Sequence, residues 1–66
     1  MNAEQMKGRW SQIKGEVLKQ WGKLTNDDLD VIDGEHEKLI GKVMERHGVS
    51  RAEAERQVNQ FGNFIQ

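Results

Sequence analysis

The side chains that could do chemistry in this 66-residue chain are few, because it has no cysteine and no tyrosine. Ser11 and Ser50 are its only serines, and neither has a recognisable base beside it that would make it a nucleophile. His36 and His47 are eleven residues apart. On a helix this spacing is about 16 Å, too far to share one metal ion. We therefore expect no enzymatic activity, no cofactor, no metal site and no small-molecule substrate.

A run of acidic residues occupies the middle of the chain. Six of the eleven acids fall there: Asp27, Asp28, Asp30, Asp33, Glu35 and Glu37. If Gly34 were the sixth residue of a calcium loop, the first, third and twelfth would be Leu29, Val31 and Ile40, which cannot ligate. We interpret the run as a solvated acidic helix start and loop.

The turn from His47 to Ser50 is a candidate for binding nucleic acid. It loosely resembles the turn of a helix-hairpin-helix motif, in which backbone amides at a helix start meet a phosphate among basic residues. The candidate residues are Arg46, Gly48, Ser50, Arg51 and Arg56. However, Ser50 replaces the motif's second glycine, and Glu53 and Glu55 fall where the phosphate would bind. An ordinary interhelical turn is the competing interpretation.

Overall composition sets further limits. The net charge is -1, so no global field favours nucleic acid or a membrane surface. No apolar run exceeds two residues, whereas a membrane span needs about 20. The first 20 residues contain no apolar block of the kind found in secretory signals. We expect a cytoplasmic protein that does not enter membranes.

Apolar residues recur with helical spacing along the first half of the chain. The first stripe is Met6, Trp10, Ile13, Val17, Trp21 and Leu24, and Gly22 follows the helix end. Thr25 is suited to cap a short second helix from about Asn26 to Asp33, which stops at Gly34. Leu24 and Leu29 occupy the two positions of a hydrophobic staple.

The second half repeats this organisation. A third helix begins near Glu35, carries Leu39, Ile40, Val43 and Met44, and stops at His47-Gly48. Ser50 and Glu53 form the pattern of a capping box, and the last helix is expected to bury Ala54, Val58, Phe61 and Ile65. Residues 13–18 weakly resemble residues 39–44. We predict an all-α fold: a compact four-helix domain of two packed helix-turn-helix hairpins, spanning residues 1–66 as a single domain.

The first helix combines a core stripe with an unusual line of glycines. Trp10 and Trp21 lie on the stripe, so we interpret them as core residues whose indole N–H groups need acceptors. Gly8, Gly15 and Gly22 are seven residues apart, and Gly8 and Gly15 face away from the core. They indicate either a marginally stable helix or bare backbone that a partner or a second copy can approach closely.

The chain also resembles a known family. The matching positions are Trp10, Lys14-Gly15, Val17, the run from Gln20 to Asp28, Leu29, Gly34, Leu39, Gly41-Lys42, Arg46 and Gly48. They resemble the CsbD-like family of small bacterial proteins associated with general stress responses. The resemblance implies a small helical cytoplasmic protein induced in stress or stationary phase, without an established activity or catalytic residues. Residues 14–19 are less basic and more apolar than the family pattern, which favours a folded domain or an extra contact at Leu18.

These observations lead to one main hypothesis and two alternatives. We expect a non-enzymatic stress-response protein that acts by weak surface interactions or as a protectant. One alternative is a nucleic-acid-binding module that uses the turn at Gly48–Ser50. The other is a small adaptor or homodimer that uses the glycine face of the first helix, so the expected state is a monomer or weak homodimer with unknown partners.

Overall fold

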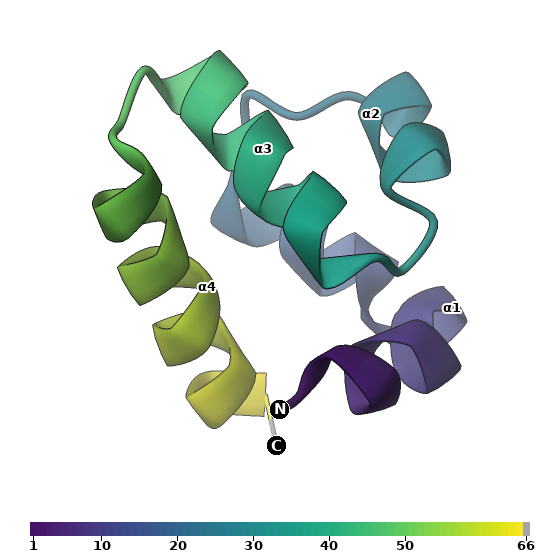
Figure 1. The fold of residues 1–66 in the computed structure, drawn as a ribbon. Helices are drawn as coiled ribbons and strands as arrows, with labels where there is room; N and C mark the ends of the chain where they lie inside the picture. The colour runs from purple at the N-terminus through teal and green to yellow at the C-terminus, as the bar shows by residue number, and fades with distance from the viewer. Residues whose placement is uncertain (66) are drawn as a thin grey trace.

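Four α-helices make up the structure, a computed structural model that describes residues 1–65 (Figure 1). They are α1 (Ala3–Gln20), α2 (Asn26–Ile32), α3 (His36–His47) and α4 (Arg51–Ile65). Between α2 and α4 lies α3, which contacts all three other helices. The radius of gyration is 10.4 Å, close to the value of about 10.8 Å expected for a compact chain of this length. The predicted all-α, compact four-helix fold is confirmed.

Reciprocal side-chain caps start the first two helices. The Thr25 hydroxyl accepts from the Asp28 amide at 3.1 Å, and the Asp28 carboxylate accepts from the Thr25 amide at 3.0 Å. The predicted N-cap of α2 is therefore confirmed. Asn2 and Gln5 form the same arrangement at the start of α1. Each box satisfies backbone N–H groups that have no acceptor within the helix.

The start of α4 differs from its prediction. The Ser50 hydroxyl accepts from the Glu53 amide at 3.1 Å, as expected for a cap. The Glu53 carboxylate, however, accepts from the side chains of Arg56 and Gln57 instead of returning to the Ser50 amide. Ser50 thus caps α4 by one hydrogen bond. The predicted reciprocal half was wrong because a guanidinium one turn along the helix competes for the same carboxylate.

Left-handed residues stop α2 and bring the chain against α1. Helix α2 ends at Ile32, one residue earlier than predicted, because Asp33 has a φ of 45°. Gly34 follows with a φ of 81°, and a Cβ there would lie 3.0 Å from the Trp10 Cβ and 3.1 Å from the Lys7 Cα. Only glycine allows both this backbone conformation and this close approach.

One cluster of buried side chains forms the core. All six residues of the predicted first stripe are buried, including the two tryptophans that we assigned to the core. The Trp21 indole N–H donates to the Gln57 side chain at 2.9 Å, and its ring lies 5.1 Å from that of Phe61 in α4. Ile65 was predicted to be buried but is only partly so, because it lies at the end of α4.

The last turns of α4 pack against the beginning of the chain. Figure 1 shows the start of α1 beside the end of α4, which are far apart in the sequence. Gly62 is buried here, and a Cβ at this position would lie 3.2 Å from both the backbone nitrogen and the Cβ of Met1. This close contact favours glycine at position 62.

Candidate functional site

The candidate turn at Gly48–Ser50 links α3 and α4 through two caps. Gly48 has a φ of 64°, and its N–H donates to the Met44 carbonyl at 2.9 Å. Ser50 begins α4 through its bond to the Glu53 amide. The geometry is that of an interhelical turn, since both residues complete helix ends.

The candidate arginines are each held by carboxylates. Arg51 donates to Glu37 of α3 at 2.6 Å and lies 3.6 Å from Glu55 in its own helix. Arg56 donates through its Nε to Glu53 at 2.8 Å. The structure therefore places these two guanidinium groups near the turn, but with their charges balanced by the protein's own acids.

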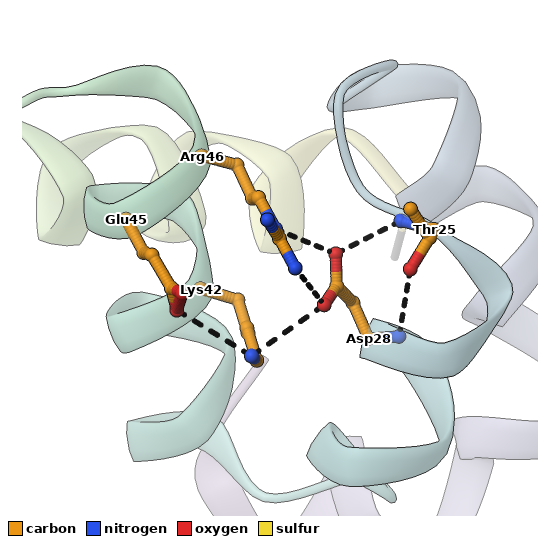
Figure 2. Close-up of polar contacts among 5 residues, drawn as sticks. All are labelled: Thr25, Asp28, Lys42, Glu45 and Arg46. Atoms are coloured by element: carbon orange, nitrogen blue, oxygen red, sulfur yellow. Dashed lines mark hydrogen bonds and ion pairs between the residues drawn. The ribbon is translucent and has the colours of Figure 1, made fainter.

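The third candidate, Arg46, belongs to a partly buried polar cluster shown in Figure 2. Its Nε and one terminal nitrogen donate to the two Asp28 carboxylate oxygens at 3.0 and 2.9 Å. Lys42 lies 3.5 Å from the same carboxylate and 3.4 Å from Glu45. With the Thr25 amide, the carboxylate thus has three donors and a neighbouring ammonium. The cluster joins α2 to α3.

Asp28 is buried, which overturns the interpretation of the acidic run at this residue. Its exposed fraction is 3%, whereas we expected a solvated acid. The pKa of Asp28 lies well below its ordinary value, chiefly because Arg46 donates hydrogen bonds to the carboxylate and the Thr25 amide adds another. The pKa of Arg46 is raised by the same pair. Near neutral pH, Asp28 therefore stays deprotonated and Arg46 stays protonated, and neither group exchanges protons there.

Sequence reasoning could have found part of this cluster. The spacing of Thr25 and Asp28 is that of a capping box, with an acid as its third helical residue. Nothing in the local pattern pairs Asp28 with Arg46, because 18 residues and a turn separate them. The pairing depends on how α2 docks against α3.

A second polar chain runs along α4. Gln57 accepts from the Trp21 indole and donates to Glu53 at 2.8 Å, so the expected indole acceptor is found for Trp21. Hydrogen bonds from Arg56 and Gln57 lower the pKa of Glu53 to about 2. This carboxylate stays ionised at neutral pH and links the core tryptophan to the surface of α4.

The histidines and acids do not gather into a metal site. His36 and His47 are both partly buried on α3, and the Nε2 of His47 is enclosed without a hydrogen-bond partner among residues 1–65. In the same range, no group of three or more histidine, aspartate or glutamate residues is arranged to hold a metal ion.

An open groove of about 550 Å³, the α1–α2 groove, lies between these two helices. Ser11, Lys14, Gly15 and Leu18 line it from α1, and Leu29 and Asp30 line it from α2. A Cβ at Gly8, Gly15 or Gly41 would meet nothing within 4 Å, which confirms that Gly8 and Gly15 face away from the core. Packing within the chain therefore does not require glycine at these three positions.

Within residues 1–65, no helix has both the length and the apolar character needed to cross a membrane.

Comparisons with known proteins agree on one family. A family model described as CsbD-like matches residues 4–56. UPF0337 protein YjbJ of Escherichia coli K12 is 47% identical over 58 residues, which cover 88% of this chain and 84% of that protein. UPF0337 protein ECA0631 of Pectobacterium atrosepticum is 46% identical over 61 residues, covering 92% and 88% of the two chains. UPF0337 protein PA4738 of Pseudomonas aeruginosa is 44% identical over 65 residues, covering 98% and 100%. No solved structure matches the chain.

Proposed function

Because the chain belongs to the CsbD-like family, we propose that it is a non-enzymatic stress-response protein that acts through weak contacts of its folded surface. The assignment to stress rests on this membership. The preference for surface contacts over catalysis rests on the structure. The two carboxyls with the most strongly lowered pKa, Asp28 and Glu53, stabilise the fold.

The lowered pKa values of Asp28 and Glu53 support a non-catalytic role. General acids and bases work best with a pKa near the operating pH. Hydrogen bonds from Arg46 and Arg56 instead lower the pKa of these two carboxyls, to about 2 for Glu53. The Asp28 charge closes the α2 cap and joins α2 to α3. The Glu53 charge holds Arg56 and Gln57 within α4. Both are structural uses.

A defined surface favours contacts over a purely hydrophilic protectant role. Capped helices and a core that includes two tryptophans give the exposed residues fixed positions. A protectant acting only by its composition would not need this arrangement. The two modes therefore differ in whether the fold is required.

The experiment compares a deletion strain with its parent in the bacterium that encodes the protein, under osmotic, acid and stationary-phase stress. We expect reduced survival that the wild-type gene restores. Val17 is fully buried, so Val17→Asp unfolds the chain while leaving its hydrophilic composition nearly unchanged. At matched protein levels this variant should fail to restore survival. Full restoration by Val17→Asp would favour the protectant role, and a deletion strain that survives like its parent would contradict a stress function.

Binding of nucleic acid at Arg46, Gly48, Ser50, Arg51 and Arg56 stays an alternative proposal. The start of α4 and three nearby guanidinium groups favour it. The carboxylates of Asp28, Glu37 and Glu53 oppose it, because each already pairs with one of these arginines.

A further inference from the structure

We propose that the α1–α2 groove binds the same groove of a second copy of the chain, around a two-fold axis that pairs Lys14 of each copy with Asp30 of the other. This inference rests on the proposal that the protein acts through surface contacts, and it names one partner.

The shape of the groove leaves apolar surface and backbone open. Leu18 is only partly buried although it packs against the core, and it provides the open apolar surface of the groove. Leu29 also lines the groove but is itself buried in the core. Gly15 belongs to the α1 wall, and a Cβ there would meet nothing within 4 Å. Glycine in an exposed helix interior is less favourable than alanine, so the open space at Gly15 comes at a cost in helix stability.

The charges of the groove are self-complementary. Lys14 stands on the α1 wall and Asp30 on the α2 wall, and both are exposed. Among residues 1–65 neither forms an ion pair, with each other or with any other residue. Four other charged residues also lack an ion pair within this range: Glu4, Arg9, Lys23 and Asp27. They do not line the groove, whereas Lys14 and Asp30 do.

A two-fold axis brings the opposite charges of the two groove walls together. In an isologous contact, a residue on one wall meets the opposite wall of the partner, and the reverse contact occurs at the same time. Lys14 then faces the second copy's Asp30, and Asp30 faces the second copy's Lys14. An unrelated partner would need a matching pattern of its own, whereas a second copy already carries it.

The size of the groove predicts weak association. A stable interface buries about 800 Å² on each partner, roughly a fifth of this chain's accessible surface of 4139 Å². The groove walls come from part of α1 and one short helix, and exposed ion pairs add little. We expect a dissociation constant between about 100 µM and 1 mM, weakened by salt.

Sedimentation equilibrium over about 20 µM to 2 mM at low salt tests the proposal. The average mass of the wild-type chain should rise from 7.6 kDa toward twice that value. Lys14→Asp and Asp30→Lys should each weaken association by at least about tenfold, and the double variant should restore it, because the opposite charges again face each other. Lys23→Asp makes the same charge change outside the groove and should leave association unchanged.

A second pair of variants separates association from folding. Gly15→Gln fills the groove while improving the helix, so it should raise the melting temperature and abolish the dimer. Gly8→Gln gives the same helical gain outside the groove lining and should leave the dimer intact. A wild-type chain that stays monomeric, a double charge swap that does not restore association, or a Gly15→Gln dimer would each overturn the proposal. These results leave the survival test of the proposed function unaffected.

Discussion

Arg46 in α3 holds the buried carboxylate of Asp28 in α2 through two hydrogen bonds of 3.0 and 2.9 Å (Figure 2). The guanidinium presents two N–H groups in one plane, which matches the two oxygens of the carboxylate. Since Asp28 also closes the cap of α2 with Thr25, one side chain starts that helix and docks it.

Replacing Asp28 by Ala should therefore destabilise the fold strongly. The change removes the partner of Arg46 and one half of the capping box. We expect thermal unfolding followed by circular dichroism at pH 7 to show a drop in Tm of about 5–15 °C. Glu37→Ala is the control, because it removes an ion pair whose Glu37 side chain is 70% exposed. It should lower Tm by about 3 °C or less, and equal drops would contradict the structural role of Asp28.

Acid should destabilise the protein through Glu53 and Asp28. The folded pKa of Glu53 is lowered from 4.5 to about 2, so its ion pair and hydrogen bonds stabilise the folded state above pH 4.5. That contribution declines as the pH falls toward 2, and Asp28 acts in the same direction. We expect urea unfolding to give a nearly constant stability from about pH 5 to 7 and a decline below about pH 5.

Two variants check the origin of this decline. Glu53→Gln should be less stable than the wild type at pH 7, and the difference should shrink as the pH approaches 2. Asp30→Asn changes an exposed acid without an ion pair among residues 1–65 and should keep the wild-type pH profile. If the stability of Glu53→Gln changed with pH in parallel with that of the wild type, Glu53 would not be a source of the acid-induced loss of stability.

Alanine at Gly8, Gly15 or Gly41 should stabilise the protein. A Cβ at each position meets nothing within 4 Å, and all three lie inside helices. Each substitution should add about 0.5–1 kcal/mol to the free energy of unfolding, measured by urea titration at low protein concentration. A loss of stability in any of the three would mean that the glycine has a role within the fold.

Gly34→Ala is the contrasting variant. Its φ of 81° is in the left-handed region, and the new Cβ would meet the backbone of Lys7 at 3.1 Å. We expect a loss of about 2 kcal/mol or more, since strain and overpacking add together. An unchanged free energy of unfolding would show that α1 and the chain after α2 can move apart at little cost, which would contradict this prediction.

Duplex DNA should perturb the turn at Gly48–Ser50 little. Asp28, Glu37 and Glu53 already pair with its three arginines, so few free charges can release counterions from DNA. In an NMR titration at low salt, we expect no saturable shifts for the amides of residues 46–56. Shifts centred there that weaken with salt would instead establish the nucleic-acid alternative.

Most helix boundaries could be predicted from the sequence because they depend on neighbouring residues. Thr25 and Ser50 cap the helices that follow them, and Gly48 ends α3 in a left-handed conformation. The apolar stripe of α1 was likewise readable, since a helix places residues three and four apart on one face. These features need no knowledge of which helix lies opposite.

Only the tertiary structure decided which charges are buried and where the surface is open. Asp28 looks like one of several solvated acids until α3 brings Arg46 against it, and Arg46 looks like a free base for the same reason. The α1–α2 groove also appears only when the short second helix is placed beside Gly15. Helical period specifies which face of a helix is apolar, whereas burial and ion pairing depend on the distance between elements far apart in the chain.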